Sequence, residues 1–489
     1  MTLKHKAISG VKWNLLATAI GVAVQFVTLI VLVRILTPSD FGLMGMIMVV
    51  IGFGQLFSDM GMSSAIIYQQ DATEAELSSL YWLNIFVGIA IFLVLCAVSP
   101  LVIAFYHEPR LKGLLFTVAF VFVITPFGQQ YEVLLQKDLE FNKLASTQML
   151  HTLANALSTI LFALSGFGVM SLVLGLLCGS SLKVLLLLMW GSRIYKPRFH
   201  FRRTDLRRYV SFGFFQLGDK TINYFNSHLD YLLIGSMLGA KALGYYTLAW
   251  NLVLRPPTMI NPIINRVTFP VFAKVQNQLD KLKKGYLKTL QLLTLANFPI
   301  LVGLCAGANT IIPIVFGDRW SDSIIIVQIL AVVAISKSVS NPTGSLLLSK
   351  GRADLGFKWN ASLVLGQMVG LYVGARAGGL IGISTAYAIL FFTYNILEYR
   401  VIIRRMLGPC LRDYISSIIP ALWIAFVMGV AMFLVFVCLR KVVPPRALLT
   451  IQLVTGVSVY IGLFVSSYRP LFYELKNTFF PVKSKRTVQ

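Results

Sequence analysis

The chain has 489 residues, of which 57% are hydrophobic and only 13% carry a formal charge. Soluble domains carry about 25% charged residues, so this chain lacks the polar surface that a water-soluble fold needs. The net charge of +24 would suit a nucleic-acid-binding protein, but the basic residues lie in short stretches between apolar runs. That pattern is typical of a membrane protein and predicts no nucleic-acid partner.

Apolar runs of membrane-spanning length follow one another along the chain. The run after Lys12 has no small-residue cleavage site behind it, so we interpret it as a retained first helix. The pattern predicts an all-α integral membrane protein of about 14 transmembrane helices. We expect them at 13–36, 41–68, 80–105, 112–135, 146–165, 168–190, 209–230, 242–271, 288–312, 322–349, 356–375, 379–402, 414–438 and 447–467.

The distribution of basic residues predicts the orientation of these helices. An even number of spans places both termini on the same side of the membrane. One set of alternate loops, together with the two terminal tails, holds roughly three times as many lysines and arginines as the other set. Because basic loops stay in the cytoplasm, we expect a multi-pass protein with both termini cytoplasmic.

Two pairs of short segments indicate an internal repeat. Leu36–Leu43, between the first two predicted helices, resembles Leu238–Tyr245, between the seventh and eighth. Gly168–Leu172 and Gly379–Ile383 resemble each other and open the sixth and twelfth predicted helices. Repeats in the same orientation are common in transporters and predict two pseudo-symmetric six-helix lobes.

The repeat and the charge pattern together divide the chain. The densest basic stretch, 193–208, is predicted to be a cytoplasmic linker between the lobes. It either anchors the topology or binds anionic lipid headgroups. The remaining divisions are an N-terminal lobe at 1–192, a C-terminal lobe at 209–405, and helices 13 and 14 with a cytoplasmic tail at 406–489.

Polar residues inside the predicted helices indicate where a polar substrate would lie, because each is costly in lipid. The first and seventh helices carry polar residues three and four apart, which places them on one face. These stripes either line a common wet cavity or form hydrogen bonds between helices. The stripes are Asn14, Thr18, Gly21, Gln25 and Thr28 in the first helix, and Gln216, Lys220, Asn223, Ser227 and Asp230, widened by Asp219 and Asn226, in the seventh.

Further charges at membrane depth extend this candidate site. Lys220, Arg255 and Lys337 would form a cationic cavity suited to a phosphate group. Arg266 either joins them or extends to the membrane surface. The full set of candidate cavity residues is Lys220, Arg255, Lys337, Arg266, Asn223, Gln216, Asn14, Gln25 and Asp59.

Two carboxylates in the seventh helix are candidates for ion coupling. Asp219 and Asp230 lie about three turns apart and therefore near one face. Asp219 alternatively pairs with Arg255 or Lys337 across the cavity, since buried charges usually pair. Asp230 has fewer basic candidates nearby and is the better ion or proton site.

No catalytic constellation is recognisable in the sequence. The histidines are isolated, and no GxSxG, P-loop or HExxH motif occurs. The five cysteines fit no metal-binding spacing, so we predict no metal, no cofactor and no enzymatic activity.

Five further segments form recognisable motifs: Leu36–Leu43, Phe57–Ala65, Asp230–Tyr246, Asn265–Phe272 and Phe316–Trp320. In combination they resemble motifs of the polysaccharide flippases (Wzx type) of the multidrug/oligosaccharidyl-lipid/polysaccharide exporter superfamily, and of the colanic-acid exporters in particular. The similarity covers roughly residues 8–405.

The resemblance implies a two-lobe helical fold that works by alternating access. It also implies a bacterial cytoplasmic membrane and an undecaprenyl-pyrophosphate-linked oligosaccharide that is moved from the inner to the outer leaflet for surface polysaccharide synthesis. Membrane lipids are expected partners, and the polysaccharide polymerase machinery is left open as another. The alternatives are a cation-coupled exporter of a drug or peptidoglycan precursor and, from another class, a membrane glycosyltransferase or ligase.

Overall fold

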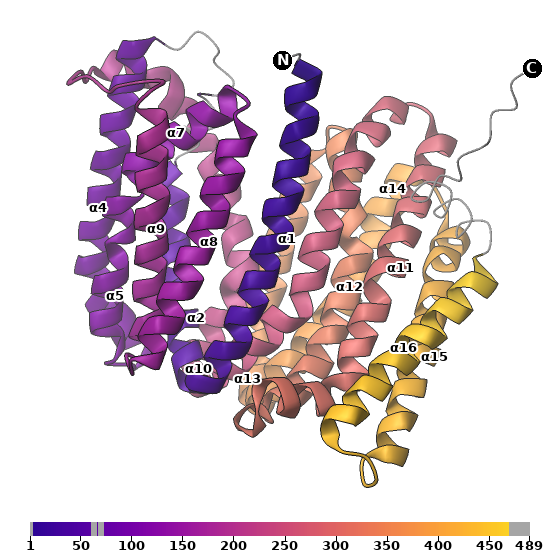
Figure 1. The fold of residues 1–489 in the computed structure, drawn as a ribbon. Coiled ribbons are helices and arrows are strands. Elements are labelled where there is room, and N and C mark those ends of the chain that lie inside the picture. The colour runs from indigo at the N-terminus through magenta and orange to yellow at the C-terminus, as the bar shows by residue number, and fades with distance from the viewer. Residues whose placement is uncertain (1–2, 60–65, 67–72, 469–489) are drawn as a thin grey trace, which may run out of the picture. The chain divides into compact units, whose positions relative to one another are not determined.

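The computed structural model describes residues 3–59, 66 and 73–468, with side chains except at 3–12, 14–15, 59, 203, 205, 207–217, 219 and 353. The regular elements of this part of the chain are helices (Figure 1). They are α1 (Leu3–Ile35), α2 (Pro38–Asp59), α4 (Glu74–Tyr106), α5 (Leu111–Ala119), α6 (Val121–Ile124), α7 (Pro126–Lys137), α8 (Phe141–Leu164), α9 (Met170–Gly191), α10 (Arg203–Val275), α11 (Leu279–Ile311), a π-helix (Ile312–Phe316), a 3-10 helix (Asp318–Trp320), α12 (Ser323–Ser349), α13 (Ala353–Glu398), a second π-helix (Tyr399–Ile403), α14 (Arg404–Leu407), α15 (Leu411–Leu439) and α16 (Pro445–Ser467).

Ten of the described helices are long and apolar enough to cross a membrane, and eleven if the bent pair α5–α6 and α7 forms one span. Two of the ten, α10 with 73 residues and α13 with 46, are long enough for two crossings of about 20 residues each. Non-helical backbone at Gly239 divides α10, and Gly378 and Gly379 divide α13. These breaks fall between predicted spans, so the all-helical membrane fold is confirmed and is consistent with about fourteen spans.

The two breaks belong to the internal repeat. Gly168 and Gly379, which correspond in the predicted repeat, have φ angles of +54° and +55°. Residues with a side chain rarely adopt a positive φ angle, whereas glycine adopts it without a steric penalty. The chain therefore has a glycine with a positive φ angle both before α9 and at the break in α13.

Gly42 and Gly244 form a second repeated feature, a reciprocal backbone contact. A Cβ atom on Gly42 would lie 1.7 Å from the carbonyl oxygen of Ala240, and one on Gly244 would lie 1.7 Å from that of Pro38. Each glycine is thus in contact with the backbone of the other copy of the repeat. The repeated turns pack directly on each other because neither glycine has a side chain.

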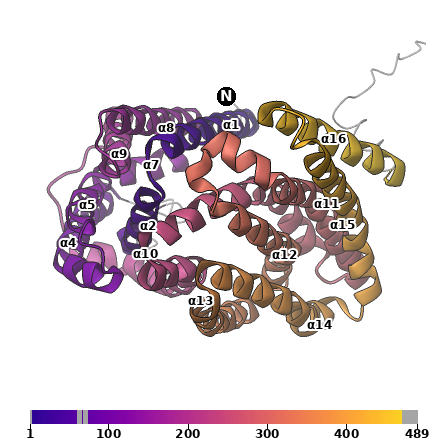
Figure 2. The same ribbon diagram turned by 90° about the horizontal axis from the view of Figure 1, so that it is seen from below.

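The chain divides into two compact units. The first contains Met1–Thr247 and Trp359–Ile383, and the second contains Leu248–Lys358 and Ser384–Gln489. In the first unit α8 packs between α1 and α9 (Figures 1 and 2). In the second, α11 packs against α12 and α15, and α16 packs on α15 (Figure 2). The division into six-helix lobes at 1–192 and 209–405 stays a prediction.

The first part of the predicted linker docks on the N-terminal end of α4. The Tyr195 hydroxyl lies 2.5 Å from the Ser78 hydroxyl, and the Trp82 indole donates to the carbonyl of Arg198 at 2.9 Å. Phe199 stacks on Trp82 with ring centroids 4.8 Å apart. Burial raises the pKa of the Tyr195 phenol, so it stays neutral in this contact. Since α10 begins at Arg203, residues 203–208 of the linker are helical.

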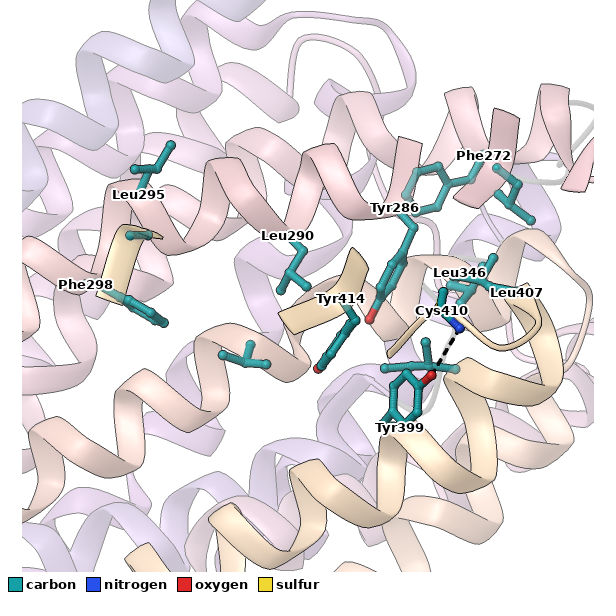
Figure 3. Packing of buried hydrophobic residues seen from close by; sticks show 14 of the residues in the cluster. Phe272, Tyr286, Leu290, Leu295, Phe298, Leu346, Tyr399, Leu407, Cys410 and Tyr414 are labelled. Carbon is teal, nitrogen blue, oxygen red and sulfur yellow. Dashed lines mark hydrogen bonds between the residues drawn. The ribbon is translucent and has the colours of Figure 1, made fainter. Parts of the chain in front are cut away.

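The core of the second unit joins α11 to α15 through buried aromatic rings. Tyr286 of α11 is fully buried and lies beside Phe272, with Tyr399 and Tyr414 in the same cluster (Figure 3). The Tyr399 hydroxyl accepts a hydrogen bond from the backbone N–H of Cys410 at 3.1 Å (Figure 3). This bond fixes the turn between α14 and α15.

Candidate functional site

Lys337 lies in the middle of α12, where sequence reasoning placed a cation at membrane depth. Its ammonium is 4.6 Å from the ring centroid of Trp250, 4.8 Å from that of Phe391 and 5.3 Å from that of Tyr387. It also donates a hydrogen bond to the Tyr387 hydroxyl at 3.3 Å. All four residues belong to the second unit.

The three rings explain how a lysine is held at this depth. An aromatic face attracts a cation through its quadrupole, and each such contact is worth about 2 kcal/mol when desolvated. The rings carry no formal negative charge of their own. They fix the position of the Lys337 ammonium within the second unit.

Lys337 belongs to a polar face of α12. Ser340 and Asn341 lie three and four residues further on, so they share this face one turn away. The Asn341 side chain accepts a hydrogen bond from Asn265 of α10 at 2.9 Å, and the Ser340 hydroxyl lies 2.6 Å from the Asn395 amide oxygen. The face thus connects α12 to both of its long neighbours.

The other predicted cations lie on α10. Arg255 and Arg266 are exposed in its second half, which belongs to the second unit. Lys220 is half-buried in the first half, which belongs to the first unit. The cavity that combines Lys220 with Arg255 and Lys337 stays a prediction.

The polar stripe of the seventh predicted helix makes hydrogen bonds to α13. The Asn360 amide donates to Asn223 at 3.1 Å, and the Gln367 amide donates to Asn226 at 3.0 Å. At these two positions the structure has the interhelical hydrogen bonds that sequence reasoning gave as the alternative to a wet cavity.

Asp230 is 1% exposed and accepts two hydrogen bonds from nearby in the sequence. The backbone N–H of Tyr231 donates to one carboxylate oxygen at 2.9 Å, and the Tyr246 hydroxyl donates to the other at 2.6 Å. Because Tyr246 follows the break at Gly239, this bond ties the two halves of α10 together. The predicted role of Asp230 in ion coupling stays a prediction.

The remaining candidate site residues are either exposed or have side chains that the structure does not describe. Gln25 is exposed on α1. The side chains of Asn14, Asp59, Gln216 and Asp219 lie outside the described residues. No geometry is therefore assigned to these four.

A polar pocket of about 360 Å³ lies in the first unit. Glu132 of α7 and Lys183 of α9 line it and form an ion pair at 2.8 Å. This pairing neutralises two charges within the membrane region. It supports structural roles for both residues.

Sequence reasoning missed two parts of the site. Trp250, Tyr387 and Phe391 are distant in sequence from Lys337, and only the four-residue spacing of Tyr387 and Phe391 indicates that they share a face. Glu398, an acidic residue within the span predicted at 379–402, was not singled out. Its presence inside an apolar run was the available signal.

A helical membrane protein with an internal repeat and cations at membrane depth has the features of a transporter. The fold is similar to that of the lipid II flippase MurJ in its inward closed conformation, with a TM-score of 0.75 at 15% identity. That alignment covers 95% of this chain and 100% of the MurJ chain. The two chains therefore share a fold.

The chain belongs to the family described as polysaccharide biosynthesis protein, whose model matches residues 31–325. It is 36% identical to the lipopolysaccharide biosynthesis protein WzxC of Escherichia coli (strain K12), over 88% of this chain and 89% of that protein. It is 34% identical to the teichuronic acid biosynthesis protein TuaB of Bacillus subtilis (strain 168), over 96% and 97% of the two chains. The resemblance to the Wzx-type flippases is confirmed.

Proposed function

We propose that this protein is a flippase for an undecaprenyl-pyrophosphate-linked oligosaccharide, which it moves from the inner to the outer leaflet of a bacterial cytoplasmic membrane by alternating access. It is a transporter and not an enzyme. The relatives WzxC and TuaB are named for lipopolysaccharide and teichuronic acid biosynthesis, and MurJ, which shares the fold, is named as a flippase for lipid II. The alternative from another functional class, a membrane glycosyltransferase or ligase, would be an enzyme.

The observation that carries this proposal is the Lys337 ammonium held by three aromatic rings within α12. A pyrophosphate group must lose water when it enters the membrane, and a fixed cation offsets part of that cost. Lysine binds phosphate as a compact point charge. The polar face around Ser340 and Asn341 adds hydrogen-bonding groups beside it.

The second unit also provides a place for the lipid chain. An apolar groove of about 380 Å³ lies among α11, α15 and α16. Its lining includes Pro299, Leu304, Met428 and Leu453, and a hydrocarbon chain is compatible with such a surface. An isoprenoid tail would remain in this groove while the headgroup binds near Lys337.

Replacing Lys337 tests the function. In cells whose polysaccharide export depends on this protein, Lys337→Ala should reduce the polymer outside the cell by at least about tenfold, the equivalent of about 1.4 kcal/mol of binding. The amount of the protein in the membrane should not change. Lys337→Arg should be milder because it keeps the charge, and Lys112→Ala, at an exposed position, serves as the control. Full export by a Lys220, Arg255 and Lys337 triple alanine variant would contradict the proposal.

A second candidate is a cation-coupled exporter of a drug or peptidoglycan precursor, because MurJ shares the fold. Competition in membrane vesicles separates the two. An excess of undecaprenyl-pyrophosphate-linked oligosaccharide should block transport under the first proposal. Competition by a drug or by lipid II alone would favour the second.

The direction of transport depends on the orientation, for which we propose cytoplasmic termini. The basic linker 193–208 would then face the cytoplasm. A cysteine introduced at Lys196 should resist an impermeant thiol reagent in intact spheroplasts, whereas one at exposed Ser321 should react. The opposite labelling pattern would reverse the orientation.

A further inference from the structure

A buried carboxyl group lies at the end of α13. Glu398 is 4% exposed, and its Oε2 atom lies 2.5 Å from the hydroxyl oxygen of Ser340 on α12. A hydrogen bond also joins the carboxyl group to Thr343, one turn further along α12. Thr343 in turn bonds to the Tyr286 hydroxyl of α11 at 3.1 Å.

The hydrogen bonds around Ser340 determine where the proton of this carboxyl group lies. The Asn395 amide nitrogen donates to the backbone carbonyl of Ser336 at 3.2 Å, which turns the amide oxygen toward Ser340 at 2.6 Å. That oxygen only accepts, so Ser340 must donate to it. A serine hydroxyl has a single proton, so an ionised Glu398 would compete with Asn395 for it, whereas a protonated Glu398 completes both contacts by donating to the Ser340 oxygen.

Within the part of the chain that the structure describes, no basic side chain forms an ion pair with Glu398. Its polar contacts among the described residues are the hydroxyls of Ser340 and Thr343. An ionised carboxylate is costly to bury without such a partner. The titratable and charged groups on the elements that surround it include Tyr286 and Lys283 of α11, Lys337 of α12, Arg266 of α10, Cys410, Asp413 and Tyr414 at the start of α15, Tyr399, and Arg400, Arg404 and Arg405.

These other charges are engaged or exposed. Lys283 and Asp413 pair with each other at 2.6 Å, and the Lys337 ammonium lies among its three rings. Arg266 is exposed on α10, as are Arg400, Arg404 and Arg405 near α14. The phenols of Tyr286 and Tyr414 belong to the buried cluster of this unit (Figure 3) and interact electrostatically with the carboxyl group.

Ionisation of Glu398 would rearrange the contact between α12 and α13. The proton leaves Oε2 for water, and the Ser340 proton turns from Asn395 to the new carboxylate. The Asn395 amide oxygen then loses its donor, so one hydrogen bond between the helices is exchanged for another. Ser340 is one turn from Lys337 on the same face of α12, so the rearrangement reaches the phosphate site.

We propose that Glu398 is a proton-binding site, and that loss of its proton changes the packing of α12 on α13 and with it the affinity of the Lys337 site for a pyrophosphate lipid. The proton site stands on its own geometry, and the link to affinity rests on the proposed function. The energy source would be a proton gradient, and the proton site would lie in the second unit.

Infrared spectroscopy of the full-length protein in lipid vesicles tests the proton site directly. A protonated carboxyl group has a carbonyl stretch separate from the amide bands. The wild type should show this band at neutral pH and lose it as the pH rises, and Glu398→Gln should lack the titrating band. Asp413→Asn, a change at an exposed ion pair, should retain it. Ser340→Ala should shift the frequency of the band, because it removes the acceptor of the Glu398 proton.

Binding of undecaprenyl pyrophosphate to the same vesicles tests the link to the substrate. The affinity of the wild type should change at least about tenfold over the pH range in which the band titrates. Glu398→Gln mimics the protonated acid, so its affinity should stay constant over that range.

The possible outcomes separate the two proposals. A titrating band that persists in Glu398→Gln, or no titrating band in the wild type, overturns the proton site. If binding depends on pH in the same way in the wild type and in Glu398→Gln, the link between the proton site and lipid affinity is overturned. Failure of the wild type to bind the lipid at any pH overturns the proposed function and the link, while the infrared result still decides the proton site.

Discussion

Asp230 in the first unit and Glu398 in the second are both buried carboxyl groups, 1% and 4% exposed, with opposite surroundings. Asp230 receives hydrogen bonds from the N–H of Tyr231 and the hydroxyl of Tyr246, and donors of this kind favour the ionised form. Glu398 and the Asn395 amide oxygen both lie against the hydroxyl of Ser340, and a proton on Glu398 relieves their competition for its single proton. Burial alone therefore does not determine charge. The balance of donors and acceptors around each group determines it.

The two groups also differ in how they are held. The hydrogen bonds of Asp230 run to residues on the same long helix, beside the close backbone contact of Gly244 with Pro38. The hydrogen bonds of Glu398 run to Ser340 and Thr343 on another helix. Asp230 fixes a turn within the first unit, whereas Glu398 is placed where its proton affects packing between helices.

The largest loss of stability is expected at the backbone contact between Gly244 and Pro38, near Tyr246, which binds Asp230. Gly244→Ala places a methyl group in the carbonyl of Pro38, so the repeated turns must separate. We expect a loss of about 3 kcal/mol or more, because overpacked backbone contacts relax poorly. Thermal unfolding in detergent, followed by size-exclusion chromatography, measures it. Gly303→Ala is the matched control, since its new methyl meets only the end of Met428 at 3.7 Å. Equal stability of the two variants would contradict the close contact.

Removing the Asp230 carboxylate should have the next largest effect. Asp230→Ala leaves the Tyr246 hydroxyl and the Tyr231 N–H without these acceptors, at a cost of about 2–4 kcal/mol in the free energy of unfolding. Asp230→Asn keeps an acceptor oxygen and should cost less. The same unfolding assay measures both.

Transport by Asp230→Asn sharpens the comparison of the two carboxyl groups. If Asp230 is the coupling site that sequence reasoning predicted, this variant should lose the dependence of transport on a cation gradient. If Glu398 alone carries the coupling, Asp230→Asn should keep it and Glu398→Gln should lose it. Loss of gradient dependence in Asp230→Asn together with its retention in Glu398→Gln would reverse the roles proposed for the two groups.

The smallest effect on stability is expected for a solvent-exposed ion pair. Arg198 of the linker and Glu74 of α4 pair at 3.2 Å with both side chains largely exposed. Arg198→Ala should change the free energy of unfolding by less than about 1 kcal/mol, because solvent screens such pairs. The measurement compares the change in the free energy of unfolding at an exposed ion pair with the change at the buried Asp230. A loss as large as that of Asp230→Ala would show that burial is not what separates them.

The sequence by itself determined the helical membrane class, the repeated turns and the presence of a cation in the middle of α12. These features depend on local properties: runs of apolar residues, glycines that permit a left-handed backbone at Gly168 and Gly379, and the position of Lys337 within its span. A polar stripe was also predictable from helical spacing. Its partners were not, and Asn223 and Asn226 bond to amides more than 130 residues away.

Only the tertiary structure decided which side chains meet. It brought Trp250, Tyr387 and Phe391 around Lys337, and it placed Asn395 and Glu398 against the same hydroxyl of Ser340. Periodicity assigns a residue to a face of its own helix, but it does not say which helix covers that face. Protonation and ligand binding depend on the covering groups, so they follow from the packing of helices distant in sequence.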